Sequence, residues 1–330
     1  MPDPTKNARI AGIGAYVPPK VMTNEDFESF LDTSDEWIMQ MTGIKERHFV
    51  EGDVATSDLA AEAGKQALED AGVEPEDVDM IIVATATPDM LFPSTACLTQ
   101  AKIGATNAFA FDLAAGCTGF LYGLVVATQF VRAGGASNAL VIGAEVLSTA
   151  ADMTDRATCV LFGDGAGAAL IQPCEPGRGV LRHYLGSDGR LARLLEMPAG
   201  GSRRRPSEET LKERLHYIHM QGRKVYVNAV RAMGDSIVKV IEEAGFEGGD
   251  LDILFPHQAN IRIIQSVAER AGLPMEKVFV NIHKYGNTSA ASIPIAIKEA
   301  VDTGALEDGM LIGMVAFGAG FTWGAALMRW

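Results

Sequence analysis

Three polar residues in apolar or small-residue surroundings could carry out chemistry together: Cys117, His257 and Asn287. Each follows a run of residues expected to form a buried strand, and the ends of such strands are where α/β sheets place their ligands. A cysteine offers a nucleophile, a histidine can handle a proton, and an asparagine amide can donate hydrogen bonds. Each residue alone has an ordinary structural explanation, as packing, a hydrogen bond or a turn. The combination indicates a site for nucleophilic catalysis.

The stretch at residues 111–120 predicts how the cysteine is presented. It combines the apolar end of a strand, small residues typical of a turn, and a long helix with Cys117 in its first turn. The positive end of a helix dipole is worth up to about 2 kcal/mol, which would lower a thiol pKa from about 8.5 toward about 7. No charged residue lies between Leu113 and Val131, so we expect this helix to be buried on every side.

The apolar runs of the chain form a pattern that occurs twice. The first set comprises residues 78–84, 110–113, 139–143 and 167–170, and the second comprises residues 251–255, 278–282, 310–315 and 324–327. The first three pairs are offset by about 170 residues and the last by 157, which indicates a duplicated α/β unit. We predict an N-terminal half, residues 1–173, with the cysteine, and a C-terminal half, residues 174–330, with the histidine and asparagine. A surface flap is expected at about residues 186–222.

Composition narrows the class of protein. The chain has 330 residues, 48% of them apolar and 21% charged, which is typical of a well-packed α/β protein with a large core. The formal net charge of −14 argues against non-specific binding to nucleic acid or to an anionic membrane. An acidic partner would therefore need a local basic patch.

Other features bear on the compartment. The four cysteines include no CxxC pair, so a disulfide framework or a zinc site is not expected. Residues 1–4 lack the basic and apolar character of a secretion signal. Two uncharged windows, residues 113–131 and 310–328, are long enough to span a membrane, but glycines interrupt both, and we interpret them as protein core. We expect a soluble cytoplasmic protein without nucleic-acid or membrane partners.

Five motifs carry a resemblance to a known family. They are Ala115-Gly116-Cys117-Thr118-Gly119-Phe120, Phe162-Gly163-Asp164-Gly165-Ala166-Gly167-Ala168, Pro256-His257-Gln258-Ala259-Asn260, Tyr285-Gly286-Asn287-Thr288-Ser289-Ala290-Ala291-Ser292 and Phe317-Gly318-Ala319-Gly320-Phe321-Thr322-Trp323-Gly324. In this order they resemble the β-ketoacyl-acyl-carrier-protein synthase III family, and the likeness runs from Ile10 to Trp330. The resemblance implies a thiolase-like α/β fold, with two halves packed as an αβαβα sandwich, and a homodimer. It also implies that an acyl-coenzyme A is condensed with malonyl-acyl carrier protein to start type II fatty-acid synthesis.

The resemblance implies roles for the three polar residues. Cys117 would attack the acyl thioester, and the backbone amides of Cys117 and Ala319 would form an oxyanion hole. His257 and Asn287 would stabilise the enolate left when the malonyl group loses CO2. No metal or redox cofactor is expected, because the thioester carbonyl accepts the electrons.

The same resemblance assigns binding residues. Trp37 and Arg156 match contacts to the coenzyme A nucleotide, and Gly222 and Asn260 match contacts to its pantetheine arm. Met41 stands where the family often has an arginine against the adenine, so the cation on that face is missing.

Two further residues match contacts to other chains. Phe92 matches a residue that reaches across the dimer interface into the neighbouring acyl pocket. Arg262 matches a basic contact to the acidic carrier protein.

Other functions stay open at this point. A polyketide starter synthase, a ketone synthase or a coenzyme A-to-carrier acyltransferase would share the fold and the three polar residues. A cysteine hydrolase is a different class, since papain-like proteases have the same chain order of Cys, His and Asn. A catalytically inactive binding scaffold is a third class, which the intact Cys117, His257 and Asn287 disfavour.

Overall fold

The computed structural model describes residues 7–330, and the expectation of no secretion signal at residues 1–4 lies outside them. Its first sheet has five strands in the order β1-β7-β6-β4-β5. Their bounds are Asn7–Tyr16 (β1), Met80–Ala84 (β4), Phe109–Leu113 (β5), Ala139–Glu145 (β6) and Gly165–Cys174 (β7). β4 runs parallel to both β5 and β6, while β7 is antiparallel to β6 and β1.

The second sheet repeats this arrangement with four strands, in the order β11-β12-β13-β8. Their bounds are Gly179–Ser187 (β8), Ile253–Pro256 (β11), Leu311–Gly318 (β12) and Thr322–Arg329 (β13). β8, β13, β12 and β11 correspond in order and direction to β1, β7, β6 and β4. The prediction of a strand at residues 278–282 is wrong. At the position in the second sheet that corresponds to β5, only an isolated parallel bridge joins Val278 to Leu254.

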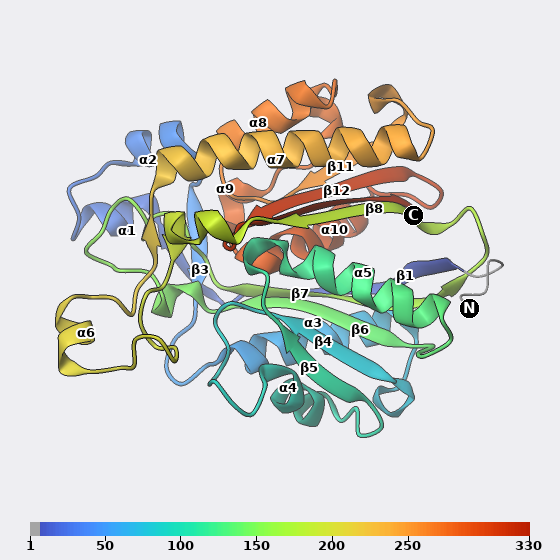
Figure 1. Cartoon of the computed structure of the whole chain (residues 1–330), viewed down its shortest axis with the longest axis horizontal. Helices are drawn as coiled ribbons and strands as arrows, with labels where there is room; N and C mark the ends of the chain where they lie inside the picture. The colour runs from blue at the N-terminus through green and yellow to red at the C-terminus, as the bar shows by residue number, and fades with distance from the viewer. Residues whose placement is uncertain (1–6) are drawn as a thin grey trace.

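Helices separate and cover the sheets in five layers (Figure 1). α5 (Gly119–Arg132) and α10 (Ser292–Asp302) lie between the sheets, where their apolar residues share one core with both. α3 (Thr56–Ala71) and α4 (Thr95–Ile103) cover the outer face of the first sheet. α7 (Gly222–Glu243) and α8 (Ile261–Arg270) cover the second. The predicted αβαβα sandwich is confirmed, whereas the division at residue 173 remains a prediction.

Residues 7–330 also contain smaller strands and α-helices, besides short 3₁₀ turns. They are β2 (Lys20–Thr23), α1 (Asn24–Glu28), α2 (Asp35–Thr42), β3 (Glu46–Phe49), β9 (Leu195–Glu196), α6 (Glu208–Lys212), β10 (His219–Met220) and α9 (Ile282–Tyr285). β9 and β10 pair within the expected flap, and α6 lies at its outer end (Figure 1).

The two uncharged windows have different structures. The first contains α5, which begins at Gly119 and leaves Gln129 and Phe130 exposed, so the expectation of burial on every side is wrong. The second forms the buried hairpin of β12 and β13. Within residues 7–330, no helix is long and apolar enough to cross a membrane.

Candidate active site

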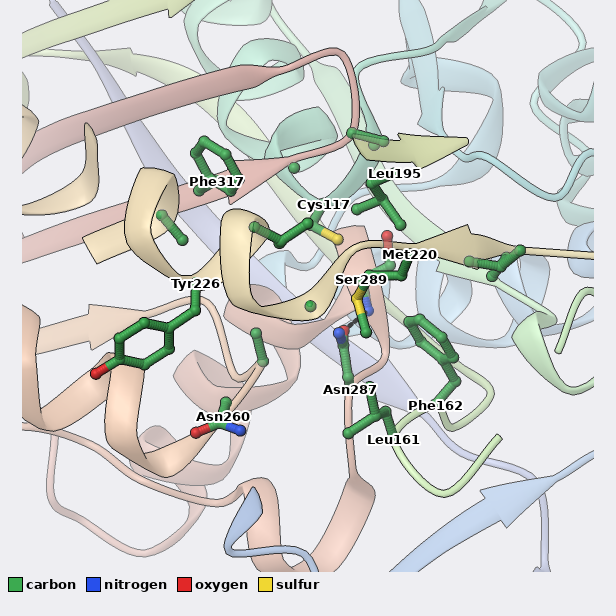
Figure 2. Close-up of a pocket in the computed structure, with 18 of the residues that line it drawn as sticks. Cys117, Leu161, Phe162, Leu195, Met220, Tyr226, Asn260, Asn287, Ser289 and Phe317 are labelled. Carbon is green, nitrogen blue, oxygen red and sulfur yellow. Dashed lines mark hydrogen bonds between the residues drawn. The ribbon is translucent and has the colours of Figure 1, made fainter. Parts of the chain in front are cut away.

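A single cavity of about 730 Å³ brings the three predicted polar residues together. Cys117 comes from the first half of the chain, and His257 and Asn287 come from the second. Apolar side chains form much of the wall, among them Leu161, Phe162, Leu195, Met220 and Phe317 (Figure 2). Polar chemistry is therefore confined to a few positions in an otherwise apolar pocket.

Cys117 lies in a 3₁₀ turn, Gly116–Thr118, between β5 and α5. Gly116 has a φ of 53°, and a Cβ at that position would lie 2.8 Å from the backbone nitrogen of Ala319. A Cβ on Gly318 would likewise lie 2.5 Å from the backbone nitrogen of Cys117. The absence of side chains at both glycines thus lets the Cys117 and Ala319 amides approach each other, as an oxyanion hole requires.

The protonation state of Cys117 differs from the expected one. Burial raises the pKa of the thiol to about 12; hydrogen bonding to Ser289 lowers it, and the Glu145 carboxylate raises it. The regular helix begins only at Gly119, and the thiol faces an apolar pocket, so desolvation of a thiolate outweighs the helix dipole. The expectation of a pKa near 7 is wrong for the resting protein.

His257 follows directly after β11 and is only 2% exposed. Its backbone amide donates to the Val315 carbonyl at 2.8 Å, and its Nδ1 lies 2.7 Å from the Ser292 hydroxyl. That hydroxyl accepts from the Gln258 amide at 3.3 Å, so we assign its own proton to Nδ1 and the ring proton to Nε2. Burial lowers the pKa of His257 to about 3, so the ring is neutral and can donate from Nε2.

Asn287 is held by its backbone and by one end of its amide. Its N–H donates to the Leu161 carbonyl at 2.8 Å, and its carbonyl accepts from the Gly163 amide at 3.0 Å. The Ser289 N–H donates to Asn287 Oδ1 at 2.9 Å (Figure 2). Because a backbone N–H can only donate, this contact identifies the oxygen end and leaves the side-chain NH2 available to a substrate oxygen.

Known proteins resemble this chain along its whole length. The family profile "3-Oxoacyl-[acyl-carrier-protein (ACP)] synthase III" matches residues 111–189, and the profile for the C terminal of the same synthase matches residues 241–330. A β-ketoacyl-[acyl-carrier-protein] synthase III of Caldanaerobacter subterraneus subsp. tengcongensis is 54% identical over 323 residues, which is 98% of each chain. The chain belongs to the β-ketoacyl-acyl-carrier-protein synthase III family.

Solved structures also resemble this synthase III family member over nearly its whole length. The 3-oxoacyl-[acyl-carrier-protein] synthase III of Aquifex aeolicus VF5 has a TM-score of 0.91 and 47% identity, covering 98% of this chain and 100% of that one. The priming β-ketosynthase of the R1128 polyketide biosynthetic pathway also has a TM-score of 0.91, at 32% identity, covering 100% of this chain and 97% of that one. The thiolase-like fold expected from the sequence is confirmed.

The residues predicted to bind coenzyme A lie around the same cavity, with one exception. Trp37, Gly222 and Asn260 line it, as does Met41, and Arg262, which is predicted to contact the carrier protein instead, is an exposed part of its wall. The Asn260 side chain donates to the Met41 carbonyl at 2.8 Å and caps α8, so part of its hydrogen bonding is already used by the fold.

The other two predicted contacts, Arg156 and Phe92, do not line the cavity. The Arg156 guanidinium lies 5.4 Å from the centre of the Trp37 ring and donates to the Asp32 carbonyl at 2.6 Å. It therefore occupies one face of the residue expected to stack on the adenine. Phe92 is 85% exposed in the loop before α4. Its predicted contact with another subunit stays a prediction.

Sequence reasoning missed three residues that support the site. Ser292 holds the His257 ring, Ser289 holds the Asn287 amide, and Glu145 accepts from the Ser289 hydroxyl. The two serines lie in the motif at residues 285–292, but their contacts depend on the fold. Glu145 had one available signal, since it is a lone carboxylate at the end of the apolar run of β6.

Proposed function

We propose that this synthase III family member condenses an acyl-coenzyme A with malonyl-acyl carrier protein through an acyl-Cys117 intermediate. The products are a 3-ketoacyl-carrier protein, CO2 and free coenzyme A. The observation that carries the proposal is the meeting of Cys117, His257 and Asn287 in one apolar cavity of a chain 54% identical to a named synthase III.

The first half-reaction is transfer of the acyl group to Cys117. The resting thiol is neutral, so it loses its proton as its sulfur attacks the thioester carbonyl and coenzyme A leaves as its thiol. The backbone amides of Cys117 and Ala319 stabilise the oxyanion, and one such donor is worth about 3 kcal/mol in the transition state. Splitting the condensation in this way replaces one difficult step with two easier ones.

The second half-reaction is loss of CO2 from the malonyl thioester. The electrons of the breaking bond form an enolate, whose oxygen can accept from His257 Nε2–H and from the Asn287 amide. The enolate carbon then attacks the acyl-Cys117 carbonyl and displaces the thiolate. We infer that no metal or redox cofactor is needed, because the thioester carbonyl accepts the electrons.

A cytoplasmic location accords with the four unpaired cysteines.

Arg262 is the residue we propose for docking the acidic carrier protein. It is exposed in the first turn of α8, at the cavity wall. Arg262→Glu should raise the KM for malonyl-carrier protein about tenfold while leaving the KM for acyl-coenzyme A nearly unchanged. Lys65→Glu on α3 makes the same charge change on another layer and should leave both constants unchanged; an equal effect of both variants would refute docking at Arg262.

A polyketide or transferase role is the second candidate, because the R1128 priming β-ketosynthase shares the fold at 32% identity. The higher identity to synthase III relatives favours fatty-acid initiation. Products formed with and without malonyl-carrier protein separate condensation from plain acyl transfer.

The deciding experiment incubates the protein with a panel of acyl-coenzyme A thioesters and follows Cys117 by intact and peptide mass spectrometry. We expect one acyl mass on Cys117 that leaves as ketoacyl-carrier protein when malonyl-carrier protein is added. Cys117→Ala should show neither event. Acylation without a new carbon–carbon bond would support the transferase role, and no acylation by any thioester would contradict the proposed function.

A further inference from the structure

A buried carboxylate lies behind the site and has no part in the two half-reactions described above. Glu145, the last residue of β6, has no exposed surface. It accepts hydrogen bonds from the backbone amides of Ala86 and Thr87, at 3.0 and 3.1 Å to Oε2. The hydroxyls of Thr85 and Thr87 donate to the same oxygen at 3.2 and 2.7 Å. The Ser289 hydroxyl donates to Oε1 at 2.9 Å.

The hydrogen bonds around Glu145 favour its ionised carboxylate and oppose burial, which raises its pKa. The Thr87 hydroxyl accepts from the Val146 amide at 2.9 Å, and the Thr85 hydroxyl accepts from the Thr87 amide at 3.0 Å, so each directs its own proton to Glu145. The backbone amides of Ala86 and Thr87 can only donate, so these two contacts favour the carboxylate. A buried charge surrounded by donors is costly to disturb, because any lost donor leaves it undersolvated.

Ser289 connects this carboxylate to Asn287. Its hydroxyl donates to Glu145. Its backbone N–H donates to Asn287 Oδ1 (Figure 2). Its φ of 50° is in the left-handed region, which costs a residue with a side chain about 1 kcal/mol or more. The two hydrogen bonds hold Ser289 in this unfavourable conformation, and in that conformation its amide reaches the Asn287 side chain.

We propose that Glu145 is a positioning residue for the decarboxylation step: through Ser289 it fixes the Asn287 amide with its NH2 group available to the enolate oxygen. This inference rests on the proposed function, since it assigns Asn287 to the second half-reaction. It predicts that the two half-reactions respond differently to changes at Glu145. Acylation of Cys117 does not use the Asn287 amide, whereas loss of CO2 does.

The charge of Glu145 strengthens the contrast. Its carboxylate raises the pKa of the Cys117 thiol, after the larger effect of burial. Removing the charge would therefore favour the thiolate that attacks acyl-coenzyme A. A general loss of structure would instead slow both half-reactions together.

The test uses Glu145→Gln and Ser289→Gly in the full chain. Glutamine keeps the shape of Glu145 but replaces one acceptor oxygen with an NH2 group, which cannot accept the hydrogen bonds that this oxygen received. Glycine removes the Ser289 hydroxyl, a donor to Glu145, while relief of the left-handed φ offsets part of that cost in stability. We expect single-turnover acylation of Cys117 to be unchanged or faster in Glu145→Gln, and the ratio of the condensation rate to the acylation rate to fall at least tenfold in both variants.

Ser148→Ala is the matched control, because the Ser148 hydroxyl donates to another buried carboxylate, Asp164, at 2.6 Å. It should lower stability without changing the ratio of the two rates. Parallel loss of both half-reactions, or condensation at the parent rate, in either test variant would overturn the role of Glu145. If the parent protein itself fails to acylate or condense, the proposed function fails instead.

Discussion

At the scale of residues, the site holds its nucleophile and its histidine neutral at rest. Burial raises the pKa of Cys117 to about 12 and lowers that of His257 to about 3, so an apolar cavity disfavours both charged forms. A resting thiolate–imidazolium pair, as in papain-like proteases, does not fit this environment. A neutral His257 that donates from Nε2 suits stabilisation of an enolate better than proton abstraction.

The shifted pKa of His257 predicts a pH dependence of stability. The ordinary pKa is 6.5 and the folded pKa is about 3, so folding favours the neutral ring. The resulting contribution of His257 to the free energy of unfolding is fully present above pH 6.5 and is lost as the pH falls toward 3. Between pH 7.5 and 5.0 the parent should lose about 2 kcal/mol more unfolding free energy than His257→Gln. Urea unfolding at the two pH values measures it, and equal losses would contradict a buried neutral histidine.

Gly318 should be essential for the close approach of the two amides. In Gly318→Ala the new methyl group would meet the Cys117 backbone nitrogen, which cannot move without displacing the oxyanion hole. We expect a stability loss of about 1–3 kcal/mol and at least a tenfold slower acylation of Cys117. Thermal unfolding and single-turnover mass spectrometry measure the two effects.

Gly189→Ala is the control for that substitution, since a Cβ there has nothing within 4 Å. It should leave both stability and acylation at parental values. A Gly318→Ala variant that acylates at the parent rate would argue against the Cys117 and Ala319 amides as the oxyanion hole.

At the scale of elements, the duplicated sheets explain why the site forms where it does. β5 and the bridge at Val278 occupy matching edges of their sheets, and Cys117 and Asn287 follow at matching places. α5 and α10 then start from these two corners and fill the space between the sheets (Figure 1). The two corresponding segments therefore face one cavity, and one supplies the nucleophile Cys117 while the other supplies the amide of Asn287.

Residues 188–221, the part of the flap expected at residues 186–222 that lies between β8 and α7, are held to the rest of the protein by an ion pair. Arg214, at a φ of 58°, donates to Asp152, and this contact holds the pKa of that carboxyl well below its usual range. The Arg214 side chain is 46% exposed, so solvent screens the pair, and we expect its loss to increase local opening only about fivefold. Arg214→Ala should speed tryptic cleavage at residues 203–205 by that factor.

Arg190→Ala removes an exposed ion pair with Asp188 inside the same flap and serves as the control. It should leave cleavage at residues 203–205 unchanged. Equal protection in the Arg214 variant and the parent would show that the flap is held by its backbone and apolar contacts alone.

At the scale of the whole molecule, the open edge of the first sheet lies beside exposed apolar side chains. β5 is the edge strand, and Leu91 and Phe92 beside the start of α4 are 77% and 85% exposed. The N–H groups of Thr95 and Ala96 in α4 donate to Asp112 of β5, so this loop and the sheet edge form one surface. An unpaired edge next to exposed apolar side chains is typical of an interface.

This surface predicts the homodimer expected from the family. A double variant, Leu91→Asp with Phe92→Asp, should weaken self-association at least a hundredfold and change which acyl-coenzyme A is preferred. Sedimentation equilibrium and the acyl panel measure the two effects. Phe30→Asp, at a half-exposed phenylalanine beyond the end of α1, should change neither. A parent protein that sediments as a monomer would refute the prediction.

The sequence by itself determined the class of fold and the reacting groups. The repeated apolar runs predicted two matching sheets, and the spacing of Cys117, His257 and Asn287 after strand ends predicted one polar site. These features are local, since strand period, turn glycines and motif order are written in consecutive residues. The synthase III resemblance rested on the same short stretches.

Only the tertiary structure decided the environment of those groups. The hydrogen bond from Ser289 to Glu145 joins residues 144 positions apart, and Gly116 meets Ala319 across a still longer separation. The thiol pKa, expected to fall, rises because desolvation depends on everything packed around the sulfur. Burial and through-space contact are properties of the assembled chain, and no stretch of sequence contains them alone.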